Sequence, residues 1–474
     1  MAPAAFRILS IDLFERGVVL RLPFRFGVVT LTACPQVFAR VRIRTEGGRE
    51  ADGAAAEVLA PKWFDKNLAL SNEDNFEQLR TSLRLARDAY LSERTAQPAF
   101  AHCAAHMHSQ VDAAAKLDLN PLIANYGPAL LDRAILDALC RALGISFYQA
   151  IQSNVVAIDT ALTPDLHGFD VSGFLGSLTP AQRIAARHTV GLVDAITAAD
   201  LDTRVGDGLP ETLEECVAFY GLTHFKLKVA GNAAADIDRL SRIAAVLDRL
   251  PHYVITLDGN EQYPDAAAVA AFWQQVRATP ALKRLVAATL YIEQPLGRGI
   301  TLDSDITALA ATTPVMIDES DNSMEAFPTA IARGYTGVSS KNCKGFYHSL
   351  LNAARCRKLN AGGEARYFMS AEDLTTQAGL GVQQDLALVN LIGLTHVERN
   401  GHHYVNGFAG QGAGRAEQQA FLAAQPGLYE AKGDNVRLAL RDGMIDLSSL
   451  SAPGFASGAH PDWRLLQPMA GGPA

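Results

Sequence analysis

Between Thr223 and Gly345 the sequence reads HFKLK (224–228), VITLD (254–258), LYIE (290–293), PVMIDE (314–319) and GVSSK (337–341), five short apolar runs that each end in a charged side chain. The spacing from Lys228 to Asp258 is 30 residues, and the next spacings are 35 to Glu293, 25 to Asp318 and 23 to Lys341. Each spacing is about the length of one strand, one helix and two loops. The pattern predicts an α/β barrel whose charged side chains lie at the carboxyl ends of its strands.

Strands and helices alternate beyond this stretch on both sides. We predict eight barrel strands, with helices such as 236–250 and 346–359 in the gaps between them. We therefore assign the barrel to residues 188–408. The predicted strands lie near 188–194, 223–229, 253–258, 290–293, 315–318, 337–341, 366–370 and 395–398.

Residues 1–152 predict a separate α+β domain. Alternating apolar residues at 8–14, 38–44 and 50–57 indicate an antiparallel meander with a turn at 46–48, and apolar residues recur at helical spacing within 72–152. The segment LPFRFGVVT (22–30) is compatible with an ordinary loop or with a flap over a pocket.

Two further segments complete the predicted domain organisation. Residues 153–187 contain Gly, Pro and Asp without a clear periodicity, and we expect a linker with an insertion there. Residues 409–474 are Gly-rich at first and then contain one or two short strand patterns. We expect this tail to pack back on the first domain.

The composition argues against several classes of function. A chain of 474 residues with 49% hydrophobic residues can bury a large core and should form two or more folding units. The net charge of -8 argues against a nucleic-acid partner. The first residues lack a signal-peptide core and no run of 18 apolar residues occurs, so we expect no membrane association and a cytoplasmic location. The six cysteines show neither CxxC nor zinc spacing and are expected to be reduced thiols.

Lysines and carboxylates at the strand ends form a candidate acid–base site. Lys226 and Lys228 are two residues apart on one predicted strand and therefore face the same way. Repulsion between their ammonium groups is expected to lower the pKa of at least one of them towards the range of a useful base. Asp258, Glu293 and Asp318 end consecutive strands and offer the hard oxygen ligands that suit Mg²⁺.

Lys341 is expected across the barrel from Lys228, with the metal between them. This arrangement suits removal of a proton from the carbon next to a carboxylate, because a cation stabilises the charge of the resulting enediolate while a lysine takes the proton. A single strand-end acid is as often a helix cap as a functional group, so the prediction depends on the coincidence of all five placements. Two alternatives stay open: a lysine Schiff-base aldolase, which leaves the three metal-type acids unexplained, and a non-catalytic binding protein.

The motifs around these residues resemble those of the enolase superfamily and, within it, of the muconate lactonising enzyme subgroup. They are KLK (226–228), LDGN (257–260), IEQPL (292–296), IDES (317–320) and KNCKG (341–345). The resemblance covers most of the chain. It implies a (β/α)7β TIM-type barrel with an N-terminal α+β capping domain, a Mg²⁺ cofactor, an isomerase or lyase activity on a small carboxylic acid (racemisation, epimerisation, cycloisomerisation or dehydration), and a homo-oligomer.

The resemblance also implies roles for single residues. Asp258, Glu293 and Asp318 would bind Mg²⁺, Lys228 and Lys341 would be the opposed acid–base pair, and Lys226 would lower the pKa of its neighbour. The loops 22–30 and 51–62 would close over the substrate. KLK stands where the mandelate racemase arrangement has KxH, no HxD motif occurs late in the barrel, and residues 394–400 near the eighth strand lack the DxD pair of dipeptide epimerases, so the substrate stays open. Residues expected to contact the rest of the substrate are Arg25, Lys62, Asn260, Glu372, Asp373 and Glu398.

Overall fold

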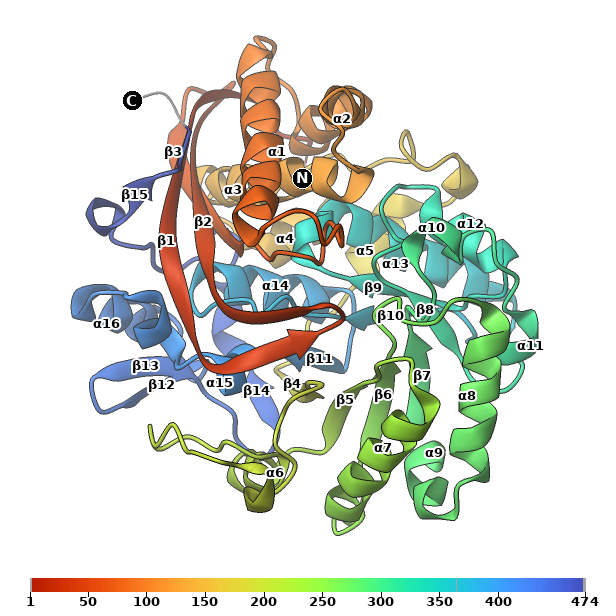
Figure 1. Cartoon of the computed structure of the whole chain (residues 1–474). Coiled ribbons are helices and arrows are strands. Elements are labelled where there is room, and N and C mark those ends of the chain that lie inside the picture. The colour runs from red at the N-terminus through yellow and green to blue at the C-terminus, as the bar shows by residue number, and fades with distance from the viewer. Residues whose placement is uncertain (1, 364, 472–474) are drawn as a thin grey trace.

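A closed parallel barrel forms the centre of the computed structural model, which describes residues 2–363 and 365–471 (Figure 1). Its eight strands are hydrogen-bonded in chain order, and the last strand pairs with the first. The predicted (β/α)7β barrel is therefore confirmed. The strands are β4 (Arg183–Val190), β5 (His224–Lys228), β6 (Val254–Asp258), β7 (Thr289–Glu293), β8 (Val315–Ile317), β9 (Gly337–Ser340), β10 (Phe368–Ala371) and β11 (His396–Arg399).

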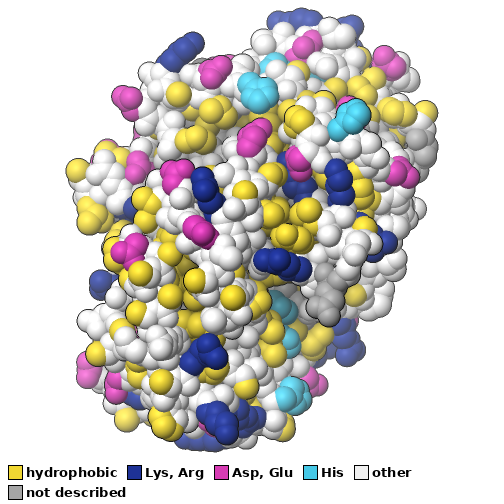
Figure 2. All heavy atoms as spheres, turned by 90° about the vertical axis from the view of Figure 1, so that its right-hand side faces the viewer, with side chains coloured by type: hydrophobic (Ala, Val, Ile, Leu, Met, Phe, Trp, Pro, Cys, Tyr) yellow, Lys and Arg dark blue, Asp and Glu magenta, His cyan; other side chains and the backbone are white. Residues whose placement is uncertain are grey.

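Helices cover the outside of the barrel (Figure 1). They include α6 (Leu213–Tyr220), α7 (Ala233–Leu247), α8 (Ala266–Ala278), α9 (Lys283–Ala287), α10 (Arg298–Thr301), α11 (Thr307–Ala310), α12 (Ala326–Ala332), α13 (Phe346–Leu359), α14 (Leu380–Leu391) and α15 (Gly401–Tyr404). Local sequence sets their ends: Thr212 caps the start of α6, and Gly221, at φ 66°, ends it. On the side where α8, α11 and α12 lie, charged side chains of both signs are interspersed with apolar ones (Figure 2).

The first barrel strand begins earlier than the sequence indicates. β4 starts at Arg183, inside the range 153–187 that we predict to be a linker, and all its residues after Arg183 are buried. Arg187 and His188 interrupt its apolar pattern, so hydrophobic periodicity does not predict a strand that begins at Arg183. The segment before it contains the short helix α5 (Val171–Ser177).

The N-terminal domain consists of an antiparallel sheet packed on helices. Its strands are β1 (Phe6–Phe26), β2 (Val29–Thr45) and β3 (Glu50–Val58), and its helices are α1 (Asn72–Ser92), α2 (Ala99–Ala115), α3 (Pro121–Leu143) and α4 (Phe147–Gln152). β3 packs so closely on α3 that a Cβ at Gly53 would lie 2.1 Å from the backbone nitrogen of Ala138. This domain confirms the predicted α+β cap.

Of the two alternatives for 22–30, the ordinary loop is wrong, because this segment is the tip of a hairpin, whereas its movement as a flap stays a prediction. β1 continues to Phe26 and β2 begins at Val29, so that only two residues form the turn. A register shift between Val19 and Phe24 accommodates Pro23, which lacks the N–H of a regular ladder. Figure 1 shows the tip of this hairpin reaching over the barrel.

The C-terminal segment contacts both domains. β14 (Met444–Asp446) pairs with β4 of the barrel, and β15 (Gln467–Pro468) pairs with β1 of the N-terminal sheet. β12 (Tyr429–Lys432) and β13 (Asn435–Leu438) form a separate hairpin. Residues 472–474 of the predicted tail lie outside the described residues. Among the helices that the structure describes, none combines the length and the apolar character needed to cross a membrane.

Candidate active site

Lys226 lies at the centre of a group of carboxylates inside the barrel. Its side chain is 1% exposed, and its Nζ lies 2.9 Å from Asp258 and 2.8 Å from Glu293. The same Nζ lies 2.6 Å from Glu372 and 3.0 Å from Glu398. The four carboxylates come from the ends of β6, β7 and β11 and from the residue after β10, so one ammonium group joins strands from both halves of the barrel.

These contacts act against the lowering of the lysine pKa that the sequence predicts. Burial alone would lower the pKa of Lys226, but the carboxylates of Asp258 and Glu293, followed by those of Glu372 and Glu398, raise it well above its usual range. The predicted lowering of a lysine pKa by repulsion between Lys226 and Lys228 stays a prediction, because two of the four carboxylates are also the expected Mg²⁺ ligands. The sequence shows the adjacent lysine but not the other two acids.

The two other lysines each pair with a different acid. Lys228 Nζ lies 2.5 Å from Asp258 Oδ2, and Lys341 Nζ lies 2.5 Å from Asp318 Oδ2. Lys228 ends β5 and Lys341 follows β9, and these strands are four positions apart in a ring of eight, hence opposite each other. The ring of Trp63 covers Lys341, with Nζ 4.3 Å from its centroid. The two ammonium groups thus approach one space from opposite sides.

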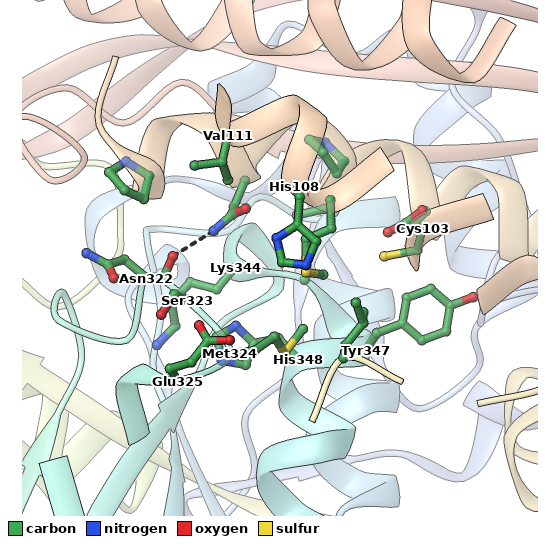
Figure 3. A pocket seen from close by; sticks show the side chains of 18 of the residues that line it. Cys103, His108, Val111, Asn322, Ser323, Met324, Glu325, Lys344, Tyr347 and His348 are labelled. Carbon is green, nitrogen blue, oxygen red and sulfur yellow. Dashed lines mark hydrogen bonds between the residues drawn. The ribbon is translucent and has the colours of Figure 1, made fainter. Parts of the chain in front are cut away.

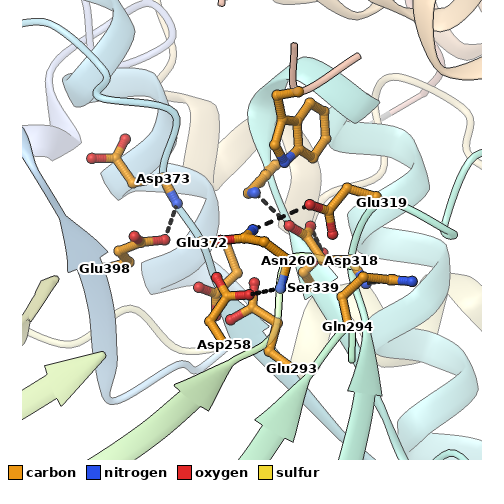
Figure 4. A network of polar contacts seen from close by, with 12 residues as sticks. Asp258, Asn260, Glu293, Gln294, Asp318, Glu319, Ser339, Glu372, Asp373 and Glu398 are labelled. Atoms are coloured by element: carbon orange, nitrogen blue, oxygen red, sulfur yellow. Dashed lines mark hydrogen bonds and ion pairs between the residues drawn. The ribbon is translucent and has the colours of Figure 1, made fainter. Parts of the chain in front are cut away.

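The acids expected to bind metal converge at this space (Figure 4). Asp258, Glu293 and Asp318 are fully buried at the ends of consecutive strands. Burial, followed by the charges of Asp258 and Glu372, raises the pKa of Glu293 well above its usual range. Against its burial, Lys341 and neighbouring Lys344 hold the pKa of Asp318 below its usual range. Lysines therefore stabilise the ionised form of Asp318, whereas burial and neighbouring acids disfavour the ionised form of Glu293.

The donor set fits a hard divalent cation. Asn260 Oδ1 and Glu319 Oε2 are buried oxygens without a hydrogen-bond partner among the described residues, and Asn260 Nδ2 donates to the other oxygen of Glu319. Unpaired buried oxygens are costly, and together with the adjacent carboxylates they are the ligand type that Mg²⁺ takes. Neither sulfur nor imidazole belongs to this donor set.

The predicted substrate residues fall into two groups. Asn260, Asp373 and Glu398 line a small cavity of about 20 Å³ together with Lys226, Lys228 and Lys341. Glu372 lies below it, paired with buried Arg187 and with Lys226.

Two predicted substrate residues point elsewhere. Arg25 is exposed and lies between Phe24 and Phe26 on the strand, so its side chain faces away from theirs. Lys62 donates to the carbonyl oxygens of Asn67 and Leu70 in its own loop, at 2.8 and 2.5 Å. The structure does not bring these two residues to the cavity.

The predicted cap segments 22–30 and 51–62 contribute Phe24, Phe26 and Ala60 to the cavity, although no apolar residue was named among the predicted substrate residues. The cavity is lined by Phe24, Phe26 and Leu31 from the hairpin tip and by Ala60 and Trp63 from the segment after β3. The alternation of Phe24 and Phe26 was the available signal, because two aromatic residues two apart on a strand face the same way.

A larger cavity, of about 240 Å³, lies outside the acid–base site, between α2, α3 and α13 (Figure 3). Lys344 and His348 border it, and Lys344 Nζ donates to Asp321 at 3.0 Å and to Ser339 Oγ at 2.6 Å. Ser339 in turn donates to Asp318 at 2.5 Å. Hydrogen bonds therefore connect this cavity with a predicted metal ligand.

Comparisons with known proteins agree with this geometry. Residues 209–405 match the family described as Enolase C-terminal domain-like. No curated protein sequence matches the chain.

Solved structures share the fold at low sequence identity. Muconate lactonizing enzyme from Mycobacterium smegmatis, in complex with muconolactone, is 16% identical, with a TM-score of 0.58, over 97% of this chain and 98% of that one. An enolase superfamily member from Roseovarius nubinhibens ISM, complexed with magnesium, is 19% identical, with a TM-score of 0.58, over 98% of this chain and 99% of that one. Dipeptide epimerase from Enterococcus faecalis V583, complexed with Mg and L-Leu-L-Tyr, is 14% identical, with a TM-score of 0.59, over 95% of this chain and 99% of that one.

Proposed function

Since the chain belongs, through its barrel domain, to the enolase superfamily, we propose that this enzyme removes the α-proton of a small carboxylic acid in a Mg²⁺-dependent reaction. The observation that carries the proposal is the placement of Lys228 and Lys341 on opposite strands, each paired at 2.5 Å with a different acid of one cluster. Two bases on opposite faces of a trapped carbon suit racemisation or epimerisation, and one base with an opposed acid suits cycloisomerisation or dehydration.

We assign the cation to Asp258, Glu293 and Asp318, with the unpaired oxygens of Asn260 and Glu319 next to them. When bound, Mg²⁺ would stabilise the negative charge that develops on the substrate carboxylate as the proton leaves. Glu319 Oε1 accepts a hydrogen bond from Asn260 at 3.2 Å, which keeps the Glu319 carboxylate close to the cluster.

The pKa values of Lys228 and Lys341 depend on the charges of the acids with which they pair. Lys228 and Lys341 pair with acids that we assign to the cation. The charge of Asp318 raises the pKa of Lys341 against the effect of burial, so any group that takes over the charge of this acid lowers the pKa of the lysine. A lysine with a lowered pKa can accept the α-proton near neutral pH.

The cap residues suit a substrate whose far end is apolar. Phe24, Phe26, Leu31 and Trp63 form the roof of the cavity, whereas its charged groups lie on the barrel side. Asp373 and Glu398 also line the cavity, and Asp373 is already paired with Arg399 at 3.3 Å. We therefore rank acids with an aromatic or aliphatic remainder above polyhydroxylated sugar acids.

The cavity must open to admit such a substrate. Its volume of about 20 Å³ holds little more than one water molecule. The hairpin tip and the segment around Trp63 are the parts of the lining that do not belong to the barrel. Their movement would admit the substrate and their return would exclude water from the lysines.

A screen for proton exchange tests the proposal. Carboxylic acids of several classes (aryl- and alkyl-substituted hydroxy acids, N-acyl amino acids, lactones and sugar acids) are incubated in D₂O with the enzyme and Mg²⁺, and loss of the α-proton signal is followed by NMR. We expect exchange with at least one class, abolished by chelation and restored by Mg²⁺. Exchange that persists at the same rate in the presence of the chelator, for every acid that exchanges, would contradict the role of Mg²⁺. The homo-oligomeric state and the cytoplasmic location remain predictions from the sequence.

A further inference from the structure

A second group of metal-ligating side chains lies on the other side of the barrel wall. His188 comes from β4, Cys216 from α6 and His403 from α15, and one ligand atom of each lies within 4.8 Å of the other two. All three are buried, with exposures of 2%, 0% and 3%. Residues 187 and 188 face opposite ways on the strand, and Arg187 points into the barrel, so His188 points outward towards α6 and α15.

The contacts within this group leave nitrogen lone pairs available. Cys216 Sγ lies 3.4 Å from His403 Nδ1. His188 Nδ1 lies 3.0 Å from His402 Nε2, so its Nε2 is free of this contact. In the tautomer that leaves His188 Nε2 unprotonated, His188 Nδ1 donates to His402 Nε2, and His402 Nδ1, which has no hydrogen-bond partner among the described residues, carries a proton.

The protonation states suit metal binding. Burial lowers the pKa of His188 to about 3 and, together with neighbouring His188, holds the pKa of His403 well below its usual range. An imidazole binds a metal through an unprotonated nitrogen, so the geometry of the ligand atoms decides whether these residues can act together. Burial raises the pKa of the Cys216 thiol, so the ion must displace the thiol proton to solvent.

We propose that His188, Cys216 and His403 bind a transition-metal ion of the Zn²⁺ type. One thiolate and two imidazoles are ligands that select Zn²⁺ over Mg²⁺, in contrast to the all-oxygen set of the acid–base site. Three protein ligands leave a fourth position for water. Asp194 Oδ2, 3.9 Å from His403 Nε2, lies on the far side of that ring, where a carboxylate orients a ligating histidine.

A catalytic use of the same residues is disfavoured. A cysteine next to a histidine and an aspartate resembles a nucleophilic triad, but Cys216 is fully buried and its raised pKa keeps it as a thiol. The bound ion instead connects β4 with α6 and with α15, which follows the last barrel strand. It therefore stabilises the place where the barrel closes, between β4 and β11.

The sequence alone gave no indication of this group. His188, Cys216 and His403 are 28 and 187 residues apart, without the paired spacing of zinc motifs. The barrel closure brings them together, because it places the segment after β11 beside β4.

Cobalt substitution tests the proposal without reference to activity. The full chain is freed of metal with a chelator and titrated with Co²⁺ in the presence of excess Mg²⁺, and absorption is recorded in the near ultraviolet. We expect one equivalent of Co²⁺ with a sulfur-to-cobalt charge-transfer band, Zn²⁺ displacing it, and a higher melting temperature with either ion. The acid–base site contains no sulfur and cannot produce this band.

Single substitutions show whether the bound ion is held by the proposed ligands. Cys216→Ser should remove the band and weaken binding by at least ~100-fold, whereas Cys356→Ser, which changes a buried thiol of α13 outside the group, should keep both. His402→Leu should weaken binding by about 10–100-fold and keep the band. Should Cys216→Ser fail to fold, His188→Gln replaces it with the same expected loss of affinity. Absence of a charge-transfer band in the folded wild-type chain, or its persistence in Cys216→Ser, would overturn the proposal.

Discussion

Lys226→Met provides a quantitative test of the central ion cluster. The four carboxylate contacts of Lys226 Nζ are 2.6–3.0 Å long, and the side chain is 1% exposed. Coulomb's law with an effective dielectric constant of 20 gives about 6 kcal/mol of gross attraction per contact, most of which offsets desolvation. Removal of one partner of a buried pair costs about 3–5 kcal/mol, because the remaining charges stay uncompensated.

Urea unfolding monitored by circular dichroism measures this loss. With a slope of about 3 kcal/mol per molar urea, the midpoint should fall by about 1–1.7 M. Lys283→Met, at an exposed lysine of α9, serves as the control and should shift the midpoint little. A loss below about 1 kcal/mol in Lys226→Met would refute the reasoning, because it would mean that the cluster is not held by this ammonium group.

The pH dependence of Lys226→Met gives a second readout. In the wild type the pKa of Lys226 is raised by folding. Its contribution to the free energy of unfolding is therefore fully present at pH values below the pKa of the lysine in the unfolded chain, and it is constant between pH 5.5 and 8. In the variant the unpaired carboxylates have raised pKa values, and the folded state binds more protons than the unfolded state. The variant should therefore lose stability as the pH rises, so that its deficit is larger at pH 8 than at pH 5.5. An equal deficit at both pH values would contradict this assignment.

Three further substitutions test separate parts of the structure. Trp63→Leu removes the ring 4.3 Å from Lys341 Nζ and should lower kcat/KM about 3- to 30-fold on a substrate found by exchange; unchanged kinetics would exclude a role for the ring. Burial raises the pKa of Asp132 to about 7, so the wild type loses stability between pH 4 and 7, and Asp132→Asn should flatten this slope in urea unfolding; parallel curves would contradict it. Gly53→Ala, whose Cβ would meet α3 at 2.1 Å, should destabilise by about 1–3 kcal/mol or more in thermal unfolding, whereas Gly17→Ala, with open space around it, should not.

The strand ends of the barrel could be predicted from the sequence because their information is local. Each of the runs that end at Lys228, Asp258 and Glu293 becomes a strand that ends at that residue, since apolar patterning and the spacing of a βα unit are both visible in one stretch. The resemblance inferred from the motifs agrees with the match of residues 209–405 to the family described as Enolase C-terminal domain-like.

The parts that could not be predicted depend on contacts distant in sequence. Glu372 and Glu398, which add to the effect of Asp258 and Glu293 in raising the pKa of Lys226, follow Lys226 by 146 and 172 residues. The position of β4 was hidden by Arg187, whose charge is offset only by the distant Glu372 inside the barrel. Arg25 was assigned to the substrate by its charge, although the alternation of its strand turns it outward.

The central claim is that Lys228 and Lys341 serve opposite faces of one carbon. The most direct measurement follows α-proton exchange in D₂O by NMR, for each enantiomer of a substrate found in the screen, with Lys228→Met, Lys341→Met and the double variant. If both faces are used, each single variant should lose exchange of one enantiomer by about 10²–10⁴-fold and keep that of the other, and the double variant should lose both. Exchange at the wild-type rate in the double variant, with Mg²⁺ bound, would contradict the account.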